Sequence, residues 1–203
     1  EISLGLVGSE MCIRDRLKRD VSQEELRQRA LNNTITEVLN KVMVKPGDTF
    51  FVKSGTIHAI GAGVLICEIQ QNSNCTYRLY DYGRRDKYGN LRELHLDKAI
   101  HVAKTEKIDL ENMHFSETSQ NGYRQKKLCE CKYFTSVLYK TDEHAEIQGN
   151  EASFLSIVVL KGKGKIGTES ETLYFKPGDS FFIHAGKRKI EIQGVCECIV
   201  TSL

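Results

Sequence analysis

Most of the chain from Lys41 onward consists of short apolar runs separated by turn-forming residues. The first half contains four such runs, rich in Val, Ile, Phe or Tyr: KVMV, TFFV, VLICEIQQ and TYRLYDY. The pattern returns after Cys131 and continues to the end of the chain, with turn signals roughly every 8–12 residues. Runs of this kind are typical of β-strands, and this spacing is typical of a sandwich or barrel. The sequence therefore predicts a mainly β fold.

Two segments have the pattern of helices instead. Residues 20–33 (DVSQEELRQRALNN) contain Ser22, followed three residues later by Glu25, which is the spacing of a capping box at a helix start. Residues 94–104 (LHLDKAIHVAK) carry apolar side chains on one side of a helix. Two further predictions concern less regular segments: a short helix over residues 34–41 and a polar linker over residues 105–127.

One eleven-residue pattern occurs twice. It begins at Lys45 as KPGDTFFVKSG and at Lys176 as KPGDSFFIHAG, and these two stretches contain both prolines of the chain. Proline presets the first position of a tight turn, glycine supplies a permissive backbone, and aspartate can bond to its own backbone. The two phenylalanines that follow can fill the wall of a barrel. A repeat of this length predicts a duplicated β-barrel.

The two copies differ at the position where a metal ligand is expected. The first copy leads to His58 at the start of the next strand, whereas the second leads to Lys189. Neutral imidazole is a good zinc ligand, and a lysine ammonium is not. Arg78 follows in the TYRLYDY run, and its guanidinium would face the same cavity if that run returned as an antiparallel strand. An arginine fork suits phosphate or an enediolate oxygen, although each residue taken alone is more often an ordinary strand residue.

The seven cysteines admit two interpretations. Cys129 and Cys131 form one C-E-C pair, and Cys196 and Cys198 form another. Residues two apart on a strand point to the same side, so the two pairs could form a four-thiolate zinc site. Zinc sites usually use wider spacing, however, and cysteine packs as a small hydrophobe in strands. We favour packing, and we expect no disulfides in a cytosolic protein.

Charge and hydropathy exclude several classes of partner. The formal net charge is +2 with 28% charged residues, which gives no electrostatic reason to expect nucleic acid or a membrane surface. No window approaches the roughly 18 consecutive apolar residues of a spanning helix. The first residues also lack the basic region and long apolar run of a signal peptide. We therefore expect a cytoplasmic protein.

Residues 1–16 have an unusual sequence. The stretch EMCIRD, from Glu10 to Asp15, is what the DNA string GAGATGTGTATAAGAGACAG encodes, and that string resembles a transposon end used in sequencing-library adaptors. The preceding LVGS fits the continuation of the same adaptor. We therefore expect residues 1–16 to be an adaptor-derived, non-native segment and the native upstream sequence to be missing. A native SEMCIRDR at this locus in an uncontaminated genome would contradict this.

The span from Lys45 to Lys104 closely resembles the zinc-dependent type I mannose-6-phosphate isomerases, in the short form typical of Gram-positive bacteria. The motifs that carry the resemblance are KPGDTFFVKSGTIHAIGAG, EIQQNSNCTYRLYDYGR and GNLRELHLDKAI. It extends over residues 17–203 and implies cupin (jelly-roll-like) β-barrels. We accordingly expect a partial catalytic cupin with a helical segment over residues 17–125 and a C-terminal structural cupin over residues 126–203.

For the reaction, the resemblance implies an aldose–ketose isomerase that interconverts mannose 6-phosphate and fructose 6-phosphate through a cis-enediol. His58 matches the family's C-terminal zinc histidine, and Arg78 matches its active-site arginine. One zinc ion would polarise the sugar carbonyl, and the arginine would offset the developing negative charge. The other zinc ligands of the family lie upstream of the part that this chain covers.

Six further residues are candidates for supporting roles. The sequence gives no reason to prefer any one of three possible general bases: Glu68, Asp81 and His95. Three cations are either phosphate contacts or part of a solvated turn: Arg84, Arg85 and Lys87.

Two departures bear on activity. The family usually has aspartate where this chain has Asn74, and a small polar residue where it has Cys75. The chain also retains a single zinc histidine, and one imidazole holds zinc poorly because affinity depends on a preformed set of ligands. We therefore expect the 203-residue polypeptide, made as written, to be inactive.

Two other functions stay open. One is a non-catalytic cupin module that binds a sugar. The other is a different metal-dependent cupin enzyme, such as an oxygenase, which would need a 2-His-1-carboxylate iron site. The stretch TIHAI lacks the H-x-H cluster usual in such cupins. The metal identity, and the loss of isomerase activity on chelation, would distinguish these alternatives.

Overall fold

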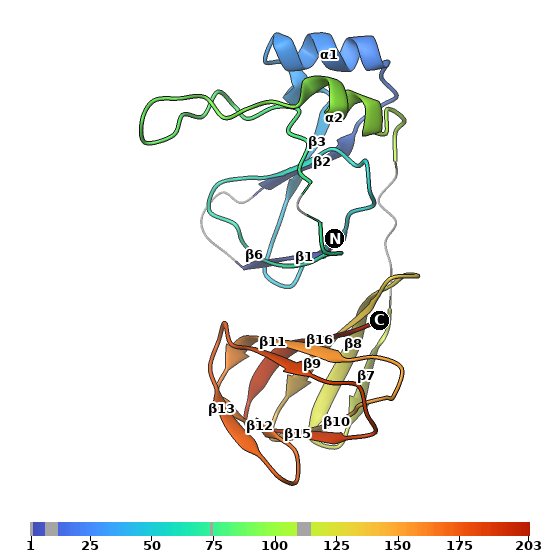
Figure 1. Ribbon diagram of the computed structural model, residues 1–203, viewed down its shortest axis with the longest axis vertical. Coiled ribbons are helices and arrows are strands. Elements are labelled where there is room, and N and C mark those ends of the chain that lie inside the picture. Colours follow the sequence, from blue (N-terminus) through green and yellow to red (C-terminus); the bar gives the residue numbers. More distant parts are fainter. Residues whose placement is uncertain (1, 7–11, 74, 109–114) are drawn as a thin grey trace. The chain divides into compact units, whose positions relative to one another are not determined.

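The computed structural model describes residues 2–6, 12–73, 75–108 and 115–203. The chain divides into two compact units, Glu1–Glu111 and Asn112–Leu203. Antiparallel strand pairs build both units (Figure 1), which confirms the mainly β prediction. The domain boundaries expected from the sequence, after residues 16 and 125, stay predictions.

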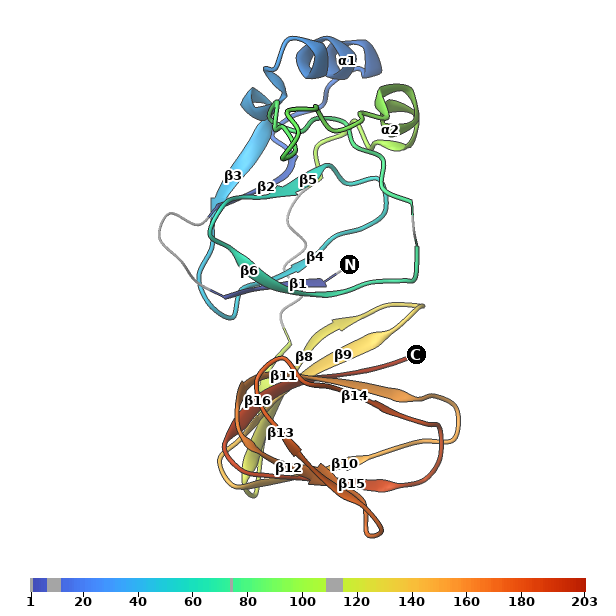
Figure 2. The ribbon, with the colours of Figure 1, turned by 60° about the vertical axis from the view of Figure 1, so that its left-hand side comes forward.

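The described residues of the first unit form two small sheets, two α-helices and one 3₁₀ helix. The helices are α1 (Gln23–Leu31), η1 (a 3₁₀ helix, Ile35–Glu37) and α2 (Leu96–Val102). The strands are β1 (Ile2–Leu6), β2 (Cys12–Leu17), β3 (Leu39–Met43), β4 (Thr49–Phe51), β5 (His58–Ile60) and β6 (Leu65–Ile69). They form the sheets β4-β1-β6 and β3-β2-β5, which appear as two layers in Figure 2.

Helix α1 begins at the predicted cap. The Ser22 hydroxyl accepts a hydrogen bond from the Glu25 backbone N–H at 3.0 Å, which satisfies one of the helix's unpaired donors. The helix buries Leu26 completely, in a core cluster that also contains Ile100 of α2. The two helices predicted over residues 20–33 and 94–104 are therefore confirmed.

Removal of this cap should destabilise the first unit. We expect Ser22→Ala to lower the free energy of unfolding by about 1 kcal/mol, because one helix-end donor loses its partner. Urea unfolding followed by circular dichroism measures this change. Ser22→Asp keeps a capping oxygen and should stay within a few tenths of a kcal/mol of the unmodified chain. Equal destabilisation by both variants would contradict the role of the cap.

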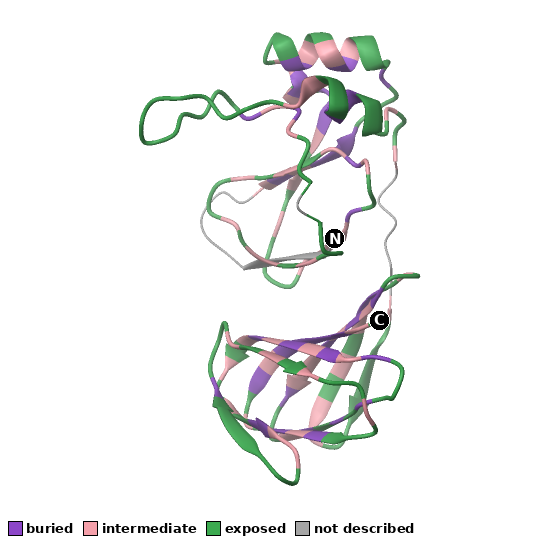
Figure 3. Cartoon of the chain, viewed as in Figure 1, coloured by how far each residue is buried: buried purple, intermediate pink, exposed green. Residues whose placement is uncertain are grey.

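The second unit is a two-sheet barrel. Its strands are β7 (Glu117–Gln120), β8 (Tyr123–Glu130), β9 (Thr135–Thr141), β10 (His144–Gln148), β11 (Leu155–Gly162), β12 (Gly164–Gly167), β13 (Thr172–Phe175), β14 (Ser180–Ile183), β15 (Lys189–Gln193) and β16 (Cys196–Ser202). One sheet has the order β14-β11-β16-β9-β8-β7, and the other has the order β10-β15-β12-β13. Buried positions alternate with partly or fully exposed ones along strands such as β10, β11 and β15 (Figure 3). One face of each sheet therefore packs into the core between them.

The repeated motif folds into the same turn in both units. The carboxylates of Asp48 and Asp179 accept the backbone N–H of Lys45 and Lys176, each at 2.9 Å. The glycines within the two turns have φ angles of 87° and 89°, in the left-handed region that glycine adopts without a steric penalty. The first turn leads into β4, and the second leads into β14. The turn predicted from both copies is thus confirmed.

Three local predictions are wrong. The helix expected over residues 34–41 is limited to η1, because β3 starts at Leu39. The run 76–82 forms no strand, and Tyr82 has a φ of 57° that breaks an extended backbone. The linker expected over residues 105–127 contains β7 and the start of β8, which pair as a hairpin. Each error has one of two causes. Either contacts between residues distant in the sequence determine the local structure, or a strand is too polar to show an apolar pattern.

Residues 12–16 belong to a sheet. Strand β2 lies between β3 and β5, with Ile13 opposite Val42 on one side and Ile60 on the other. The chain as written therefore places part of the segment expected to be adaptor-derived inside the first unit. The origin of residues 1–16 stays a prediction.

Candidate functional site

His58 borders a small cavity between the two sheets of the first unit. The cavity has a volume of about 20 Å³, and His58 and Ile60 line it from one sheet while Phe50 lines it from the other. This volume is about that of one water molecule or one ion. The His58 Nδ1 atom lies 3.0 Å from the carbonyl oxygen of Thr56. A proton on Nδ1 makes this a hydrogen bond and leaves the lone pair on Nε2, which is the arrangement of a metal-binding histidine.

A buried carboxylate lies beside this histidine. Asp15 is the cross-strand partner of His58 and is 2% exposed. Its Oδ2 atom accepts a hydrogen bond from Arg16 at 2.7 Å, and its Oδ1 atom has no partner among the described residues. Burial raises the pKa of Asp15, and the charges of Arg16 and His58 oppose this rise. Asp15 lies in the segment expected to be non-native, so it was not among the residues predicted from the sequence to form the site.

The donors at this cavity fit only part of a zinc site. The unpaired Asp15 oxygen and the His58 imidazole are one carboxylate and one nitrogen, both ordinary zinc ligands. A catalytic zinc takes three protein ligands, so at least one more is required. Because residues 1–16 are expected to be non-native, we assign Asp15 no role in the reaction proposed below.

Contacts with nearby residues hold the Arg78 side chain in place. Its Nη1 atom donates to the carbonyl oxygen of Glu93 at 2.8 Å, and its Nε atom lies 3.8 Å from Asp81. Its backbone forms reciprocal bonds with His95, which accepts from the Arg78 N–H through Nδ1. These contacts fix the position of the guanidinium. Arg78 does not line the cavity beside His58.

Asp81 is the centre of a cluster of arginines. It is 5% exposed, and its Oδ1 atom contacts the guanidinium groups of Arg78, Arg84 and Arg92. One carboxylate against three guanidinium groups leaves net positive charge at this point. The sequence could not reveal this cluster because it depends on the folding of the loop between residues 78 and 92.

The remaining candidates have these positions. Glu68 lies exposed on β6, and the Nε2 atom of His95 lies 3.9 Å from Glu93. Arg85 donates to the carbonyl oxygen of Gly89, and the Lys87 ammonium lies 4.9 Å from the ring centre of Tyr88. Asn74 lies outside the described residues, and Cys75 is exposed.

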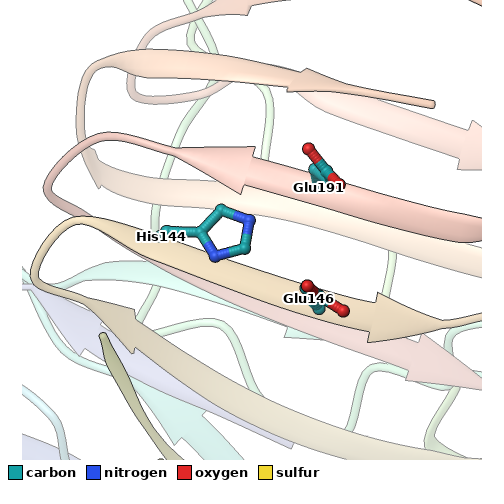
Figure 4. A group of neighbouring side chains, drawn as sticks. All are labelled: His144, Glu146 and Glu191. Atoms are coloured by element: carbon teal, nitrogen blue, oxygen red, sulfur yellow. The ribbon is translucent and has the colours of Figure 1, made fainter. Parts of the chain in front are cut away.

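A second group of ligand-type side chains lies in the second unit. Among the described residues, one set of three or more side chains could hold a metal ion: His144, Glu146 and Glu191 (Figure 4). Their ligand atoms lie within 4.8 Å of one another. They face outward, because the alternate residues Ala145 and Ile190 are completely buried. Two nitrogen or oxygen ligands of one zinc ion are at most about 4.2 Å apart, so separations within 4.8 Å are of the order that a metal site requires.

Lys189 already supplies a cation to this group. Its ammonium lies 2.8 Å from Glu146 and 3.3 Å from Glu191. The hydrogen bonds to Glu146 and then Glu191 raise the pKa of Lys189. The residue that corresponds to His58 in the second copy of the repeat therefore forms ion pairs with two carboxylates that face each other across β10 and β15.

The cysteines pack rather than form a ligand set. Cys129, Cys196 and Cys198 are at most 4% exposed, and strand β9 separates β8 from β16, which carry them. Burial raises the pKa of Cys129 to about 11. Cys131 contacts the carbonyl oxygen of Phe134. Among the described residues, these thiols do not form the four-thiolate zinc site considered from the sequence.

The barrels and their repeated turn define a cupin protein. Residues 124–203 match a family model described as the cupin domain of mannose-6-phosphate isomerase. A solved structure, the mannose 6-phosphate isomerase from Bacillus subtilis, superposes with a TM-score of 0.90 at 32% sequence identity. That match covers 100% of this chain and 64% of the other.

Curated relatives point to the same family. The chain is 39% identical to the mannose-6-phosphate isomerase ManA of Bacillus subtilis over 182 residues, which are 90% of this chain and 57% of the relative. It is 34% identical to the mannose-6-phosphate isomerase of Streptococcus mutans, over 89% of this chain and 56% of that one. The chain belongs to the mannose-6-phosphate isomerase family. It spans little more than half the length of these relatives.

The described residues include no helix that is both long and apolar enough to cross a membrane.

Proposed function

We propose that the protein represented by this chain is an aldose–ketose isomerase that interconverts mannose 6-phosphate and fructose 6-phosphate. The substrate is a small sugar phosphate, the metal is one zinc ion, and the expected location is the cytoplasm. His58 is the zinc ligand that this chain supplies, and Arg78 is its active-site cation. The remaining zinc ligands belong to the region that the longer relatives have in addition.

The chemistry requires stabilisation of an enediolate. Zinc, when bound, acts as a Lewis acid on the sugar oxygens. The Thr56 carbonyl fixes the His58 ring so that Nε2 presents its lone pair. The Arg78 guanidinium, held by Glu93 and Asp81, is a fixed positive charge that can offset the negative charge developing on the enediolate oxygen.

The orientation of the His58 ring is the observation that carries this proposal. An imidazole at the edge of a cavity between two sheets, with Nδ1 directed at a backbone carbonyl, has the geometry of a metal ligand. The similarity to isomerases along most of the chain supports the choice of reaction.

Supplying the missing region should create activity. We expect the chain as written to show no isomerase turnover, because its described residues do not complete a zinc site at His58. A chimera that joins the upstream part of Bacillus subtilis ManA to this chain at Leu17 should interconvert the two sugar phosphates. A coupled assay in both directions measures this.

Controls make the test decisive. Chelation should abolish the activity of the chimera, and zinc should restore it. The matched variant His58→Ala should lose zinc, measured by metal analysis of the purified chimera. Turnover by the chain alone would contradict the need for zinc ligands from the missing region. A folded chimera without turnover, or a metal content unchanged by His58→Ala, would contradict the proposal.

A further inference from the structure

The second unit contains a cavity with a basic lining. Its volume is about 780 Å³, and it is open to solvent, since the side chains of Lys163, Lys165, Tyr174 and Lys176 in its lining are exposed. Its lining residues lie on or next to β12, β13 and β15, the strands labelled in Figure 1. Lys165 and Tyr174, which line it, point outward, since the neighbouring Ile166 and Phe175 are buried in the core. Lys165 and Tyr174 therefore lie on the outer face of the four-stranded sheet.

Three lysines converge on this cavity from different segments. Lys163 lies between β11 and β12, Lys165 lies on β12, and Lys176 opens the repeated turn after β13. Asp179 is the acidic residue in the lining. Three ammonium groups against one carboxylate give the cavity a net positive charge, which favours an anion.

These lysines differ from several others in the same unit. Lys161, Lys187 and Lys189 form ion pairs with glutamates at 3.3, 3.5 and 2.8 Å. The three lysines of the cavity form no ion pair with a carboxylate of the described residues. Their charge is therefore available to a bound anion.

The repeated turn gives a direct comparison. In the first copy, the Lys45 ammonium lies 3.0 Å from Asp48. In the second copy, Asp179 accepts the Lys176 backbone N–H in the same way, but no ion pair joins the two side chains within the described structure. The two turns have the same backbone hydrogen bond, but the Lys45 ammonium pairs with its own turn, whereas Lys176 lines the cavity.

An exposed aromatic ring completes the lining. Tyr174 is 79% exposed and is the cross-strand partner of Lys165. The Lys165 ammonium lies 5.2 Å from the ring centre, a cation–π arrangement. The ring presents an apolar surface directly beside the charged groups, which suits a ligand with both an anionic and an organic part.

We propose that this cavity binds a small phosphorylated sugar. The lysine ammonium groups contact the phosphate as point charges, and the ring of Tyr174 contacts the sugar. The site belongs to the second unit, uses none of the residues of the His58 site, and does not depend on the proposed isomerase reaction.

Direct binding to the whole chain tests the proposal. Inorganic phosphate, glucose 6-phosphate and glucose are titrated separately at constant ionic strength, with amide NMR shifts of Gly164 and Gly194 as the readout. We expect saturable shifts with both phosphates, tighter binding of glucose 6-phosphate, and none with glucose. Absence of saturable shifts with either phosphate would overturn the proposal, and equal affinity for the two would overturn the contact with Tyr174.

Substitutions then locate the site. Lys165→Met should weaken phosphate binding by about two- to fivefold, the effect of one exposed charge contact, and Lys163→Met/Lys165→Met should weaken it further. Methionine keeps most of the stem, so the barrel should stay folded, which circular dichroism checks. Lys126→Met, an exposed lysine of β8 outside the cavity, removes the same charge and should leave affinity unchanged. An equal loss with Lys126→Met would show that only net charge attracts the anion and would overturn the assigned site.

Discussion

Replacing Arg78 with alanine in the chimera should lower kcat for isomerisation by about 10²–10³-fold, the usual effect of removing one preorganised group that stabilises a developing oxyanion. The guanidinium is held by the Glu93 carbonyl and by Asp81, so it needs little reorganisation during the reaction. Steady-state kinetics in both directions measures the loss. KM should change less than kcat, because the proposed contact strengthens only as charge develops.

Two further variants separate chemistry from structure. Arg78→Lys keeps a charge but loses the planar fork, so its kcat should fall between those of the unmodified chimera and Arg78→Ala. Arg92→Ala removes another guanidinium from the same carboxylate, and we expect nearly unchanged kcat because Arg92 has no assigned role in the reaction. Similar losses from Arg92→Ala and Arg78→Ala would contradict a catalytic function for Arg78.

The second large effect concerns stability. Ile157→Ala should reduce the free energy of unfolding of the second unit by about 2–5 kcal/mol, because it removes a completely buried side chain from the core of the barrel. Hydrogen exchange of amides in that unit, combined with urea unfolding, measures the change. The amides around Leu26 in the first unit report whether the two units unfold independently.

An exposed leucine in the same unit serves as the control. Leu173→Ala, at a position 48% exposed, should change the free energy of unfolding by less than about 0.5 kcal/mol. An effect as large as that of Ile157→Ala would mean that burial in the core does not set the stability of this barrel.

Features determined by short-range sequence could be predicted. The cap at Ser22 and the two turns beginning at Lys45 and Lys176 depend on residues within three positions of each other, and the structure contains all of them. The cupin fold and the family followed from long motifs and are confirmed.

Features that depend on distant contacts or on polar strands could not be predicted from the sequence. The segment around Arg78 has a strand-like composition, yet its backbone bonds to His95 and its side chain to Glu93. The hairpin of β7 and β8 escaped detection because all four residues of β7 are exposed, so no apolar alternation marks it. The Asn121-Gly122 pair between the two strands was a usable turn signal, and Gly122 has a φ of 87°.

In the candidate site, too, some features depend on neighbouring residues and others depend on distant contacts. The position of His58 at the start of β5 follows from the turn before it, and the structure agrees. The carboxylate of Asp81 among three guanidinium groups requires the closed loop, and the outward-facing group around Glu146 requires the register of β10 against β15.

The repeated turn explains why the similarity between the two barrels is still visible in the sequence. A side-chain carbon added at Gly47 or Gly178 would meet no atom within 4 Å, so these turns depend on backbone preference and on their own aspartates, and not on the packing of any wall. Wall residues must change together with their neighbours as a core diverges, whereas such a turn can persist unaltered. Positions 58 and 189 could therefore diverge to a histidine and a lysine while the turn before each of them kept its sequence.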